Sequence, residues 1–374
     1  MRERRIGKRK FLNSLCLLLL FLYPSPAQTQ TKPQTAPPVR LPRGTVILSE
    51  APPPAPTPKP TPEEREIAEG DVISVNTSEV LLPVTVRDAS GRLVTTLTRD
   101  DFRVFEDGRE QPLSDLALRQ VPVDVVLMVD ASSSAASNLD DFRRAIVGFA
   151  SKLSPDDRIS LIKFDDRVEL LQDWTQSRVQ LRRSLSRITP GVFTRFNDAL
   201  LLAAREQLKS ARNRHAIIVL TDGIDSGRGY TTLEAALKSL LEAQATVYVV
   251  SNTEIERTKK REELDSLLAS SPSAVRFNEL RIGDLREGLR VLDASENSLA
   301  QLTAATGGRL YKPASFDQLD ATYAEVAEEL RHQYALYYTP LNKARDGGFR
   351  RVRVETTDPS NKVSARIGYF APSR

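Results

Sequence analysis

Between residues 123 and 311, short apolar runs alternate with segments of helical periodicity, and this alternation constrains the fold more than any other feature of the sequence. The runs have the length and β-branched content of buried strands. They are residues 125–129, 159–164, 215–220 and 246–250. Strands that alternate with helices in this way build a mostly parallel sheet with helices on both faces. The sequence therefore predicts an α/β domain over residues 121–312. Within it, we expect a helical insertion at 253–290 and a last helix at 298–306.

The segments on either side of this domain, residues 64–120 and 313–374, contain short strand-like runs. The first includes residues 102–106, which run into the hairpin signal Asp107-Gly108. The second begins with an amphipathic helix and continues with strand-like residues. Small sheets of two or three strands are marginally stable alone. We therefore expect both segments to combine into one small β-sandwich-like module, with the α/β domain inserted between them.

The N-terminus has the organisation of an export signal. The first ten residues carry a net charge of +5, and an apolar run at 11–23 follows. Ser25 and Ala27 then stand at the spacing of a signal-peptidase site, so residues 1–27 are interpreted as a cleaved signal peptide. The run is shorter than the roughly 20 residues of a membrane-spanning helix, and the alternative is a retained N-terminal anchor. We expect a secreted, periplasmic or cell-surface protein.

Residues 28–63 are rich in proline and have no apolar periodicity, which predicts an extended linker. The formal net charge of the chain is +4, and the basic N-terminus accounts for all of it. The rest of the sequence is close to neutral, which excludes an electrostatic case for nucleic-acid binding. The only cysteine, Cys16, lies within the apolar run, so a processed chain would contain neither disulfide nor thiolate ligand.

Polar residues follow the predicted strands at the edge where α/β proteins bind their ligands. Hydroxyl and carboxylate oxygens are the donors that Mg²⁺, Mn²⁺ and Ca²⁺ prefer. Two carboxylates balance a divalent charge, whereas three neutral hydroxyls leave the ion able to attract an external carboxylate. The sequence thus predicts a metal-binding site that recognises a partner. Its candidate ligands are Asp130, Ser132, Ser134, Thr194 and Asp222. Nearby, Asp225 is expected to be a solvated loop acid, and Asp198 to cap or pack its own helix.

Residues 123–312 resemble a von Willebrand factor A (VWA) domain, and the residues above resemble its metal-ion-dependent adhesion site (MIDAS). The resemblance implies a Rossmann-like fold. It also implies hydroxyl ligation by Ser132, Ser134 and Thr194, with Asp130 and Asp222 bound directly or through water. The external ligand would be a protein that offers an Asp or Glu carboxylate. Residues 100–108, 307–311 and 368–372 are also similar to a bacterial subgroup, the VWFA-related domain proteins.

Three classes of function follow from these features. The favoured one is a non-catalytic adhesion protein that binds its partner through a Mg²⁺, Mn²⁺ or Ca²⁺ ion. The second is a Mg²⁺-dependent phosphohydrolase that uses Asp130. For this class Ser132 stands where a second acidic residue would be wanted, and no glycine-rich phosphate loop is present. The third is a structural envelope module whose metal site is vestigial.

Overall fold

The computed structural model divides the chain into two units, residues 1–72 and 73–374, and all residues that it describes lie in the second. The described residues are 79–118, 121–133, 139–221, 225 and 229–373. The predicted signal peptide and proline-rich linker therefore lie outside them. Among the described residues, no helix is both long enough and apolar enough to cross a membrane.

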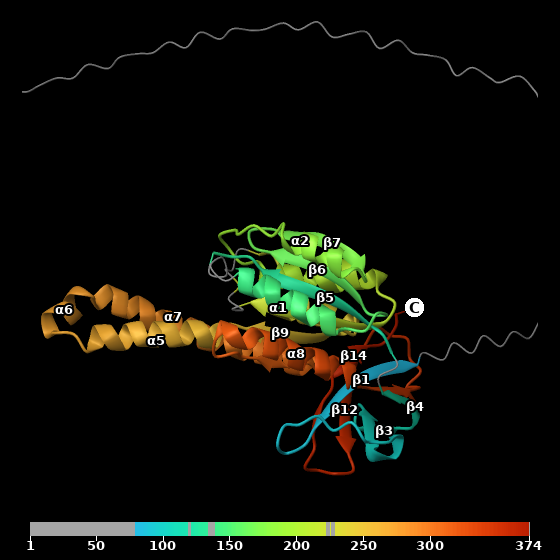
Figure 1. Cartoon of the computed structure of the whole chain (residues 1–374). Helices are drawn as coiled ribbons and strands as arrows, with labels where there is room; N and C mark the ends of the chain where they lie inside the picture. The colour runs from blue at the N-terminus through green and yellow to red at the C-terminus, as the bar shows by residue number, and fades with distance from the viewer. Residues whose placement is uncertain (1–78, 119–120, 134–138, 222–224, 226–228, 374) are drawn as a thin grey trace, which may run out of the picture. The chain divides into compact units, whose positions relative to one another are not determined.

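A six-stranded sheet forms the centre of the α/β domain, in the order β10-β9-β8-β5-β6-β7 (Figure 1). All pairs are parallel except β6 with the edge strand β7. β7 contains mostly half-buried residues interrupted by two exposed ones, and so lacks the continuous apolar run that indicated the other strands. The strands are β5 (Val123–Asp130), β6 (Arg158–Phe164), β7 (Val168–Thr175), β8 (Arg214–Thr221), β9 (Thr246–Ser251) and β10 (Leu310–Tyr311).

Helices cover both faces of this sheet, because successive side chains of a strand point to opposite faces. On β5, Leu127 packs with the helices of one face and Met128 with those of the other. The first face carries α1 (Leu139–Lys152), α2 (Arg178–Leu185) and α8 (Leu319–Arg331). The second face carries α3 (Phe196–Leu202), α4 (Leu233–Glu242) and the end of α7 (Glu279–Thr306). The predicted α/β fold class is confirmed.

Three helices form an arm that extends away from the sheet (Figure 1): α5 (Thr253–Leu268), α6 (Pro272–Phe277) and α7. We expected the insertion to end at 290 and a separate helix at 298–306, but α7 is one helix of 28 residues. Its buried residues Ile282, Leu285, Leu292 and Leu299 recur at helical spacing, so no break separates insertion from domain. The helix ends at Gly307, whose φ of 77° is the left-handed C-terminal cap that glycine adopts without strain.

Strands from the two flanking segments form two four-stranded antiparallel sheets, β13-β1-β11-β4 and β14-β12-β2-β3. In the first, β1 pairs with β11 through residues 80–84 and with β13 through 85–87. Pro83 therefore lies where β1 has one neighbouring strand, a position that tolerates its missing N–H. The strands are β1 (Val80–Arg87), β2 (Phe102–Glu106), β3 (Arg109–Gln111), β4 (Leu113–Leu118), β11 (Tyr334–Tyr338), β12 (Phe349–Thr356), β13 (Lys362–Ser364) and β14 (Gly368–Phe370).

Buried polar contacts join these sheets to the α/β domain. Glu329 of α8 accepts hydrogen bonds from Arg87 of β1 at 2.5 Å and from the Tyr311 hydroxyl at 2.8 Å. Arg366 is buried and donates to the Leu81 carbonyl at 2.6 Å and to Gln244 at 3.1 Å. Burial lowers the pKa of Arg366 to about 10. The helix α8 is thus tied directly to β1, the first strand of the flanking sheets.

Candidate metal centre

Asp130 is the last residue of β5, and its carboxylate is buried at the carboxyl edge of the parallel sheet. One oxygen accepts a hydrogen bond from the backbone N–H of Ser132 at 2.9 Å. The other accepts one from the Thr221 hydroxyl at 2.6 Å. Thr221 ends β8, which lies beside β5, so the parallel pairing itself brings these two side chains together. These two hydrogen bonds fix the orientation of the carboxylate.

The loop that carries Thr194 lies against the loop that follows β5. The Gly191 N–H donates to the Ala131 carbonyl at 2.8 Å, and the Ser133 hydroxyl donates to the Val192 carbonyl at 3.3 Å. Gly191 is required here, because a Cβ at this position would lie 2.5 Å from the Cγ atom of Asp165. The two loops therefore lie against each other, and Thr194 follows Val192 by two positions in the second of them.

Three of the five predicted ligands, Asp130, Ser132 and Thr194, are described, and all three are buried. Ser134 and Asp222 lie outside the described residues. Thr221, which immediately precedes Asp222, was not among the predicted ligands, although its hydroxyl contacts Asp130. The motif Thr-Asp-Gly contained this signal, but only the register of β8 beside β5 gives the threonine its role.

The described donors fit a hard divalent cation, because carboxylate and hydroxyl oxygens are the ligands of Mg²⁺, Mn²⁺ and Ca²⁺ rather than of softer metals. Within the described part of the chain, no three His, Cys, Asp or Glu side chains gather in a group that could hold a metal ion. A site in which hydroxyls supply most donors forms no such group. Asp130, Ser132 and Thr194 offer one carboxylate and two hydroxyls, which are oxygen donors of the kind that a hard divalent cation takes.

Three carboxylates fix the loops around this edge, and the sequence analysis did not predict these roles. They belong to Asp166, Asp225 and Asp198. Asp166 accepts hydrogen bonds from Val192 N at 2.9 Å and Phe193 N at 3.1 Å, which lower its pKa. Asp225 is half-buried rather than solvated, and accepts a hydrogen bond from Asn197 N, in the first turn of α3, at 2.9 Å. These hydrogen bonds join residues 26–28 positions apart, so no local sequence motif predicts them.

Asp198 also differs from its expected role. It makes no cap for its own helix α3; its carboxylate accepts hydrogen bonds from Tyr230 N at 3.0 Å and Thr231 N at 2.9 Å. It therefore anchors the loop that leads into α4. The same carboxylate also lies 4.0 Å from the guanidinium of Arg195, the N-cap residue of α3, so it keeps a contact with its own helix.

A buried ion pair lies beside the site, at the end of β6. Lys163 Nζ is 2.7 Å from Asp165 Oδ2, and both side chains are almost completely buried. Lys163 is also 3.7 Å from Glu169. The chain turns here against the β5 loop, since Ala131 N donates to the Phe164 carbonyl at 3.0 Å. The lysine charge is thus balanced by Asp165, which directly follows β6, and by Glu169 of the neighbouring strand β7.

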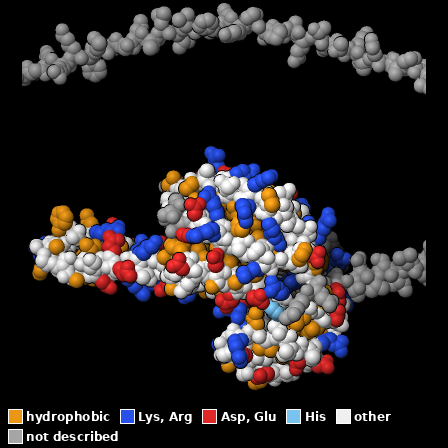
Figure 2. Space-filling model, viewed as in Figure 1, with side chains coloured by type: hydrophobic (Ala, Val, Ile, Leu, Met, Phe, Trp, Pro, Cys, Tyr) orange, Lys and Arg blue, Asp and Glu red, His pale blue; other side chains and the backbone are white. Residues whose placement is uncertain are grey.

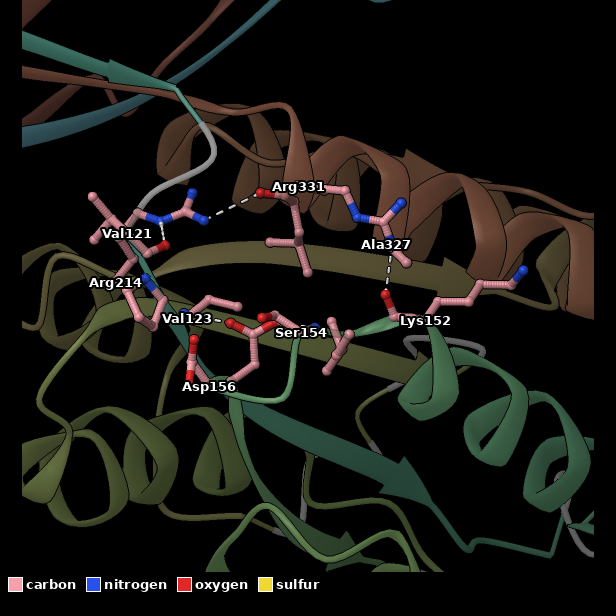
Figure 3. Close-up of a pocket in the computed structure, with 12 residues that line it drawn as sticks. Val121, Val123, Lys152, Ser154, Asp156, Arg214, Ala327 and Arg331 are labelled. Atoms are coloured by element: carbon pink, nitrogen blue, oxygen red, sulfur yellow. Dashed lines mark hydrogen bonds between the residues drawn. The ribbon is translucent and has the colours of Figure 1, made fainter.

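A small cavity of about 90 Å³ lies at the opposite, amino-terminal edge of the sheet, between the strand starts and α8 (Figure 3). Its polar groups hold the fold together. Arg214 donates to the carbonyls of Val121 and Leu330, and Arg331 donates to the Lys152 carbonyl. Asp157 accepts from the N–H groups of Val123 and Ser154. These hydrogen bonds mark the cavity as structural.

Comparison with known proteins identifies one domain family whose model matches part of this chain. Residues 124–287 match the model of the von Willebrand factor type A domain. An uncharacterised protein of Synechocystis sp. is 29% identical over 109 residues, which are 28% of this chain and 26% of that protein. The chain thus spans about a quarter of the length of this curated relative.

Two solved structures show similarity at low sequence identity. BatB from Bacteroides thetaiotaomicron is 19% identical, with a TM-score of 0.40, and the match covers 56% of this chain and 99% of BatB. Proximal thread matrix protein 1 from the mussel byssus, with a zinc-occupied MIDAS motif, is 16% identical with a TM-score of 0.40. That match covers 60% of this chain and 49% of the mussel protein.

Proposed function

The chain carries a von Willebrand factor type A domain, and on that premise we propose that it is a secreted, non-catalytic adhesion protein that binds a protein partner through a divalent metal ion. The observation that supports this proposal is the hydrogen bonding of the loop that follows Asp130 and Ser132 to the loop that leads to Thr194, at the carboxyl edge of the sheet. The ion would be held by these three residues with Ser134 and Asp222, and Mg²⁺ is the metal that we favour.

Each described residue has a distinct task in this proposal. The hydroxyls of Ser132 and Thr194 ligate the ion, and Asp130 binds it directly or through water. Thr221 orients the Asp130 carboxylate through its 2.6 Å hydrogen bond. When bound, the ion supplies a coordination position that an Asp or Glu of the partner can fill. Neutral hydroxyls leave much of the ionic charge available for that carboxylate.

The proposal places the protein outside the cytoplasm, either in the periplasm or at the cell surface, where an adhesion site meets its partners. It rests on the basic and apolar N-terminal sequence that we interpret as a signal peptide. N-terminal sequencing of the protein from its host tests this part alone. A mature chain that starts at Gln28 supports export, and a chain that retains residues 1–27 supports the alternative of an anchor.

A pull-down from envelope extracts tests the binding function. Full-length protein is used as bait in Mg²⁺ and in EDTA, beside the variants Thr194→Ala and Thr322→Ala. Thr322 is the matched control, because its hydroxyl donates within its own helix to the Gln318 carbonyl. We expect a partner that is retained in Mg²⁺ by wild type and Thr322→Ala, and released by EDTA or Thr194→Ala. A partner indifferent to metal and to Thr194→Ala would contradict the proposal.

The non-catalytic part of the proposal has its own test. Purified protein is incubated with phosphate esters and Mg²⁺, and the released phosphate is measured. We expect no turnover above that of the Asp130→Ala variant. Turnover that Asp130→Ala removes would show that the protein is a phosphohydrolase instead.

A further inference from the structure

We propose that a cavity at the amino-terminal edge of the central sheet binds a small organic acid, whose carboxylate pairs with the buried guanidinium of Arg366. The predicted metal ligands follow the carboxyl-terminal ends of the strands, so this cavity is a second site at the opposite edge. The inference goes beyond the proposed function and does not depend on it.

The α/β domain and the flanking sheets both line this cavity, whose volume is about 300 Å³. Its walls come from β1, the start of β8, the end of α4 and the segment between β13 and β14. A volume of this size is at the lower limit of sites that bind small organic ligands. Apart from Arg214, the lining residues differ from those of the cavity in Figure 3. They include Leu81, Pro83, Glu242, Gln244 and Arg366.

The guanidinium of Arg366 is buried with part of its hydrogen-bonding capacity unused. The side chain is 3% exposed, and both of its hydrogen bonds come from the Nη2 atom. This atom donates to the Leu81 carbonyl at 2.6 Å and to Gln244 Oε1 at 3.1 Å. Among the described residues, Nη1 has no hydrogen-bond partner, and Nε is buried without one. Buried donors normally have a partner, so an acceptor from solution would complete this group.

The positive charge of Arg366 also lacks a counter-charge from the described part of the chain. Both oxygens that it contacts belong to neutral groups. Burial lowers the pKa of Arg366 to about 10, and the groups that oppose this effect are the hydroxyls of Tyr338 and Tyr369, not a carboxylate. The guanidinium therefore stays charged at neutral pH. A buried charge without a partner is unfavourable, and an anion in the cavity would stabilise it.

Other buried arginines of the same fold are better satisfied. Arg350 is 7% exposed and forms an ion pair with Asp346 at 2.8 Å. Arg214 is also 7% exposed, and three of its nitrogens, Nε, Nη1 and Nη2, each donate to an oxygen. Arg366 differs from both, because it has neither a carboxylate partner nor three occupied nitrogens.

Gln244 holds one side of this guanidinium from an unusual backbone position. It follows the C-cap of α4 with a φ of 54°, where its N–H donates to the Leu241 carbonyl and the next N–H donates to the Leu240 carbonyl. Glycine is the usual residue at this point of a helix end, because a side chain disfavours positive φ. Here a glutamine takes the position, and its side-chain oxygen accepts the hydrogen bond from Arg366.

A monovalent carboxylate matches what the cavity lacks. Carboxylate and guanidinium are both planar and can form two parallel hydrogen bonds. Leu81 and Pro83 offer apolar surface on the same wall for the rest of a small organic acid. Glu242 also lines the cavity, 3.4 Å from Lys238, and its negative charge repels a divalent anion more strongly than a monovalent one. The cavity therefore favours an organic monocarboxylate over phosphate.

The test titrates sodium acetate into full-length protein whose arginines carry nitrogen-15, with sodium chloride adjusted to keep the ionic strength constant. The Nε–H signal of Arg366 is followed by NMR and is identified by its absence in Arg366→Gln. We expect a saturable shift with a dissociation constant on the order of 1 mM, and weaker binding of phosphate. Gln244→Glu places a carboxylate at the oxygen that already contacts Arg366, so acetate affinity should fall at least tenfold.

The matched control is Arg276→Gln, which removes the same charge from an exposed site on α6. The helical arm that includes α6 carries Lys and Arg interspersed with Asp and Glu (Figure 2), so this change leaves the cavity intact. Arg276→Gln should bind acetate as wild type does.

Three results would overturn the inference. One is the absence of a saturable acetate shift in wild type. Another is wild-type acetate affinity in Gln244→Glu, a variant that keeps Arg366 and so decides the question even if Arg366→Gln does not fold. The third is tighter binding of phosphate than of acetate, which would contradict the carboxylate assignment. None of these measurements involves Mg²⁺, so the proposed metal-dependent function stands or fails separately.

Discussion

The two ends of β5 carry aspartates in opposite chemical settings. Asp124, at the start of the strand, and Asp130, at its end, are 0% and 1% exposed. Asp124 accepts two hydrogen bonds from the Arg158 guanidinium, at 2.9 and 2.5 Å, and further ones from Arg212 N and the Asn213 side chain. Asp130 accepts hydrogen bonds from uncharged donors, the Ser132 N–H and the Thr221 hydroxyl.

The difference is what we expect if one edge of the sheet serves stability and the other serves the proposed binding of a metal ion. At the amino-terminal edge, a charged partner from the neighbouring strand β6 balances the carboxylate inside the fold. At the carboxyl-terminal edge, hydroxyls and backbone groups orient the carboxylate, an environment suited to a cation from solution. This is the edge at which α/β sheets bind their ligands. The two aspartates therefore predict opposite responses to mutation, metal and pH.

The largest expected effect is the loss of stability in Asp124→Ala. This change leaves a partly buried guanidinium and two N–H groups without their acceptor, which typically costs about 3–5 kcal/mol. Asp130→Ala loses hydrogen bonds from uncharged donors, which typically costs about 1–2 kcal/mol. Urea denaturation of both variants in EDTA measures the free energy of unfolding. Equal losses at the two positions would remove the proposed division between the two edges.

A metal ion should act on the carboxyl-terminal edge alone, because Asp130 is a predicted ligand and Asp124 is not. A ligand at 100 times its dissociation constant stabilises the native state by about 2.7 kcal/mol when it binds only that state. We expect saturating Mg²⁺ to raise the free energy of unfolding of wild type by about this amount. Asp130→Ala should show no increase. Denaturation curves recorded with Mg²⁺ and with EDTA provide the measurement, and an increase in Asp130→Ala equal to that of wild type would contradict the site.

Low pH should reduce the stability that Asp124 contributes at the amino-terminal edge of the sheet. Burial raises the pKa of Asp124, but hydrogen bonds from Arg158, Arg212 N and Asn213 outweigh it, so the folded pKa lies below the ordinary pKa of an aspartate. A lowered carboxylate pKa contributes stability above the unfolded pKa, and this contribution is lost as pH falls through the folded value. The difference in free energy of unfolding between wild type and Asp124→Asn should be constant near neutral pH and shrink as pH falls below the unfolded-state aspartate pKa of about 3.9. A gap that widens in acid would contradict this.

The smallest change in stability is expected for Thr221→Val, which removes the hydroxyl that orients Asp130. Loss of one hydrogen bond costs about 1 kcal/mol. Groups that orient a metal ligand change metal affinity by about 10- to 100-fold, so Mg²⁺ affinity should fall at least tenfold. Thr322→Val on α8 is the matched control, and its affinity should equal that of wild type. Titration calorimetry of both variants compares them directly, and unchanged affinity in Thr221→Val would exclude the orienting role.

The fold class was predictable because the strands of a buried parallel sheet are continuous apolar runs, as at 125–129 and 215–220. β7 was not predicted, because a half-exposed edge strand lacks a continuous apolar run. The full length of α7 was not predicted either, because the charged residues of the arm interrupt its apolar pattern. At the site, the order of motifs indicated which strand ends carry oxygen donors. The roles of Asp166 and Asp198 depend on N–H groups 26–33 residues away, which only the folded loops bring near.

The central claim is that Asp130 and its neighbours hold one divalent ion. Isothermal titration calorimetry of Mg²⁺ or Mn²⁺ into full-length protein tests it most directly, with the Asp130→Ala/Asp222→Ala double variant beside wild type. The sheet is buried independently of the ion, so the variant should remain folded, which circular dichroism verifies. We predict one ion bound per wild-type chain and none per double-variant chain. Equal metal uptake by the two proteins would contradict the account.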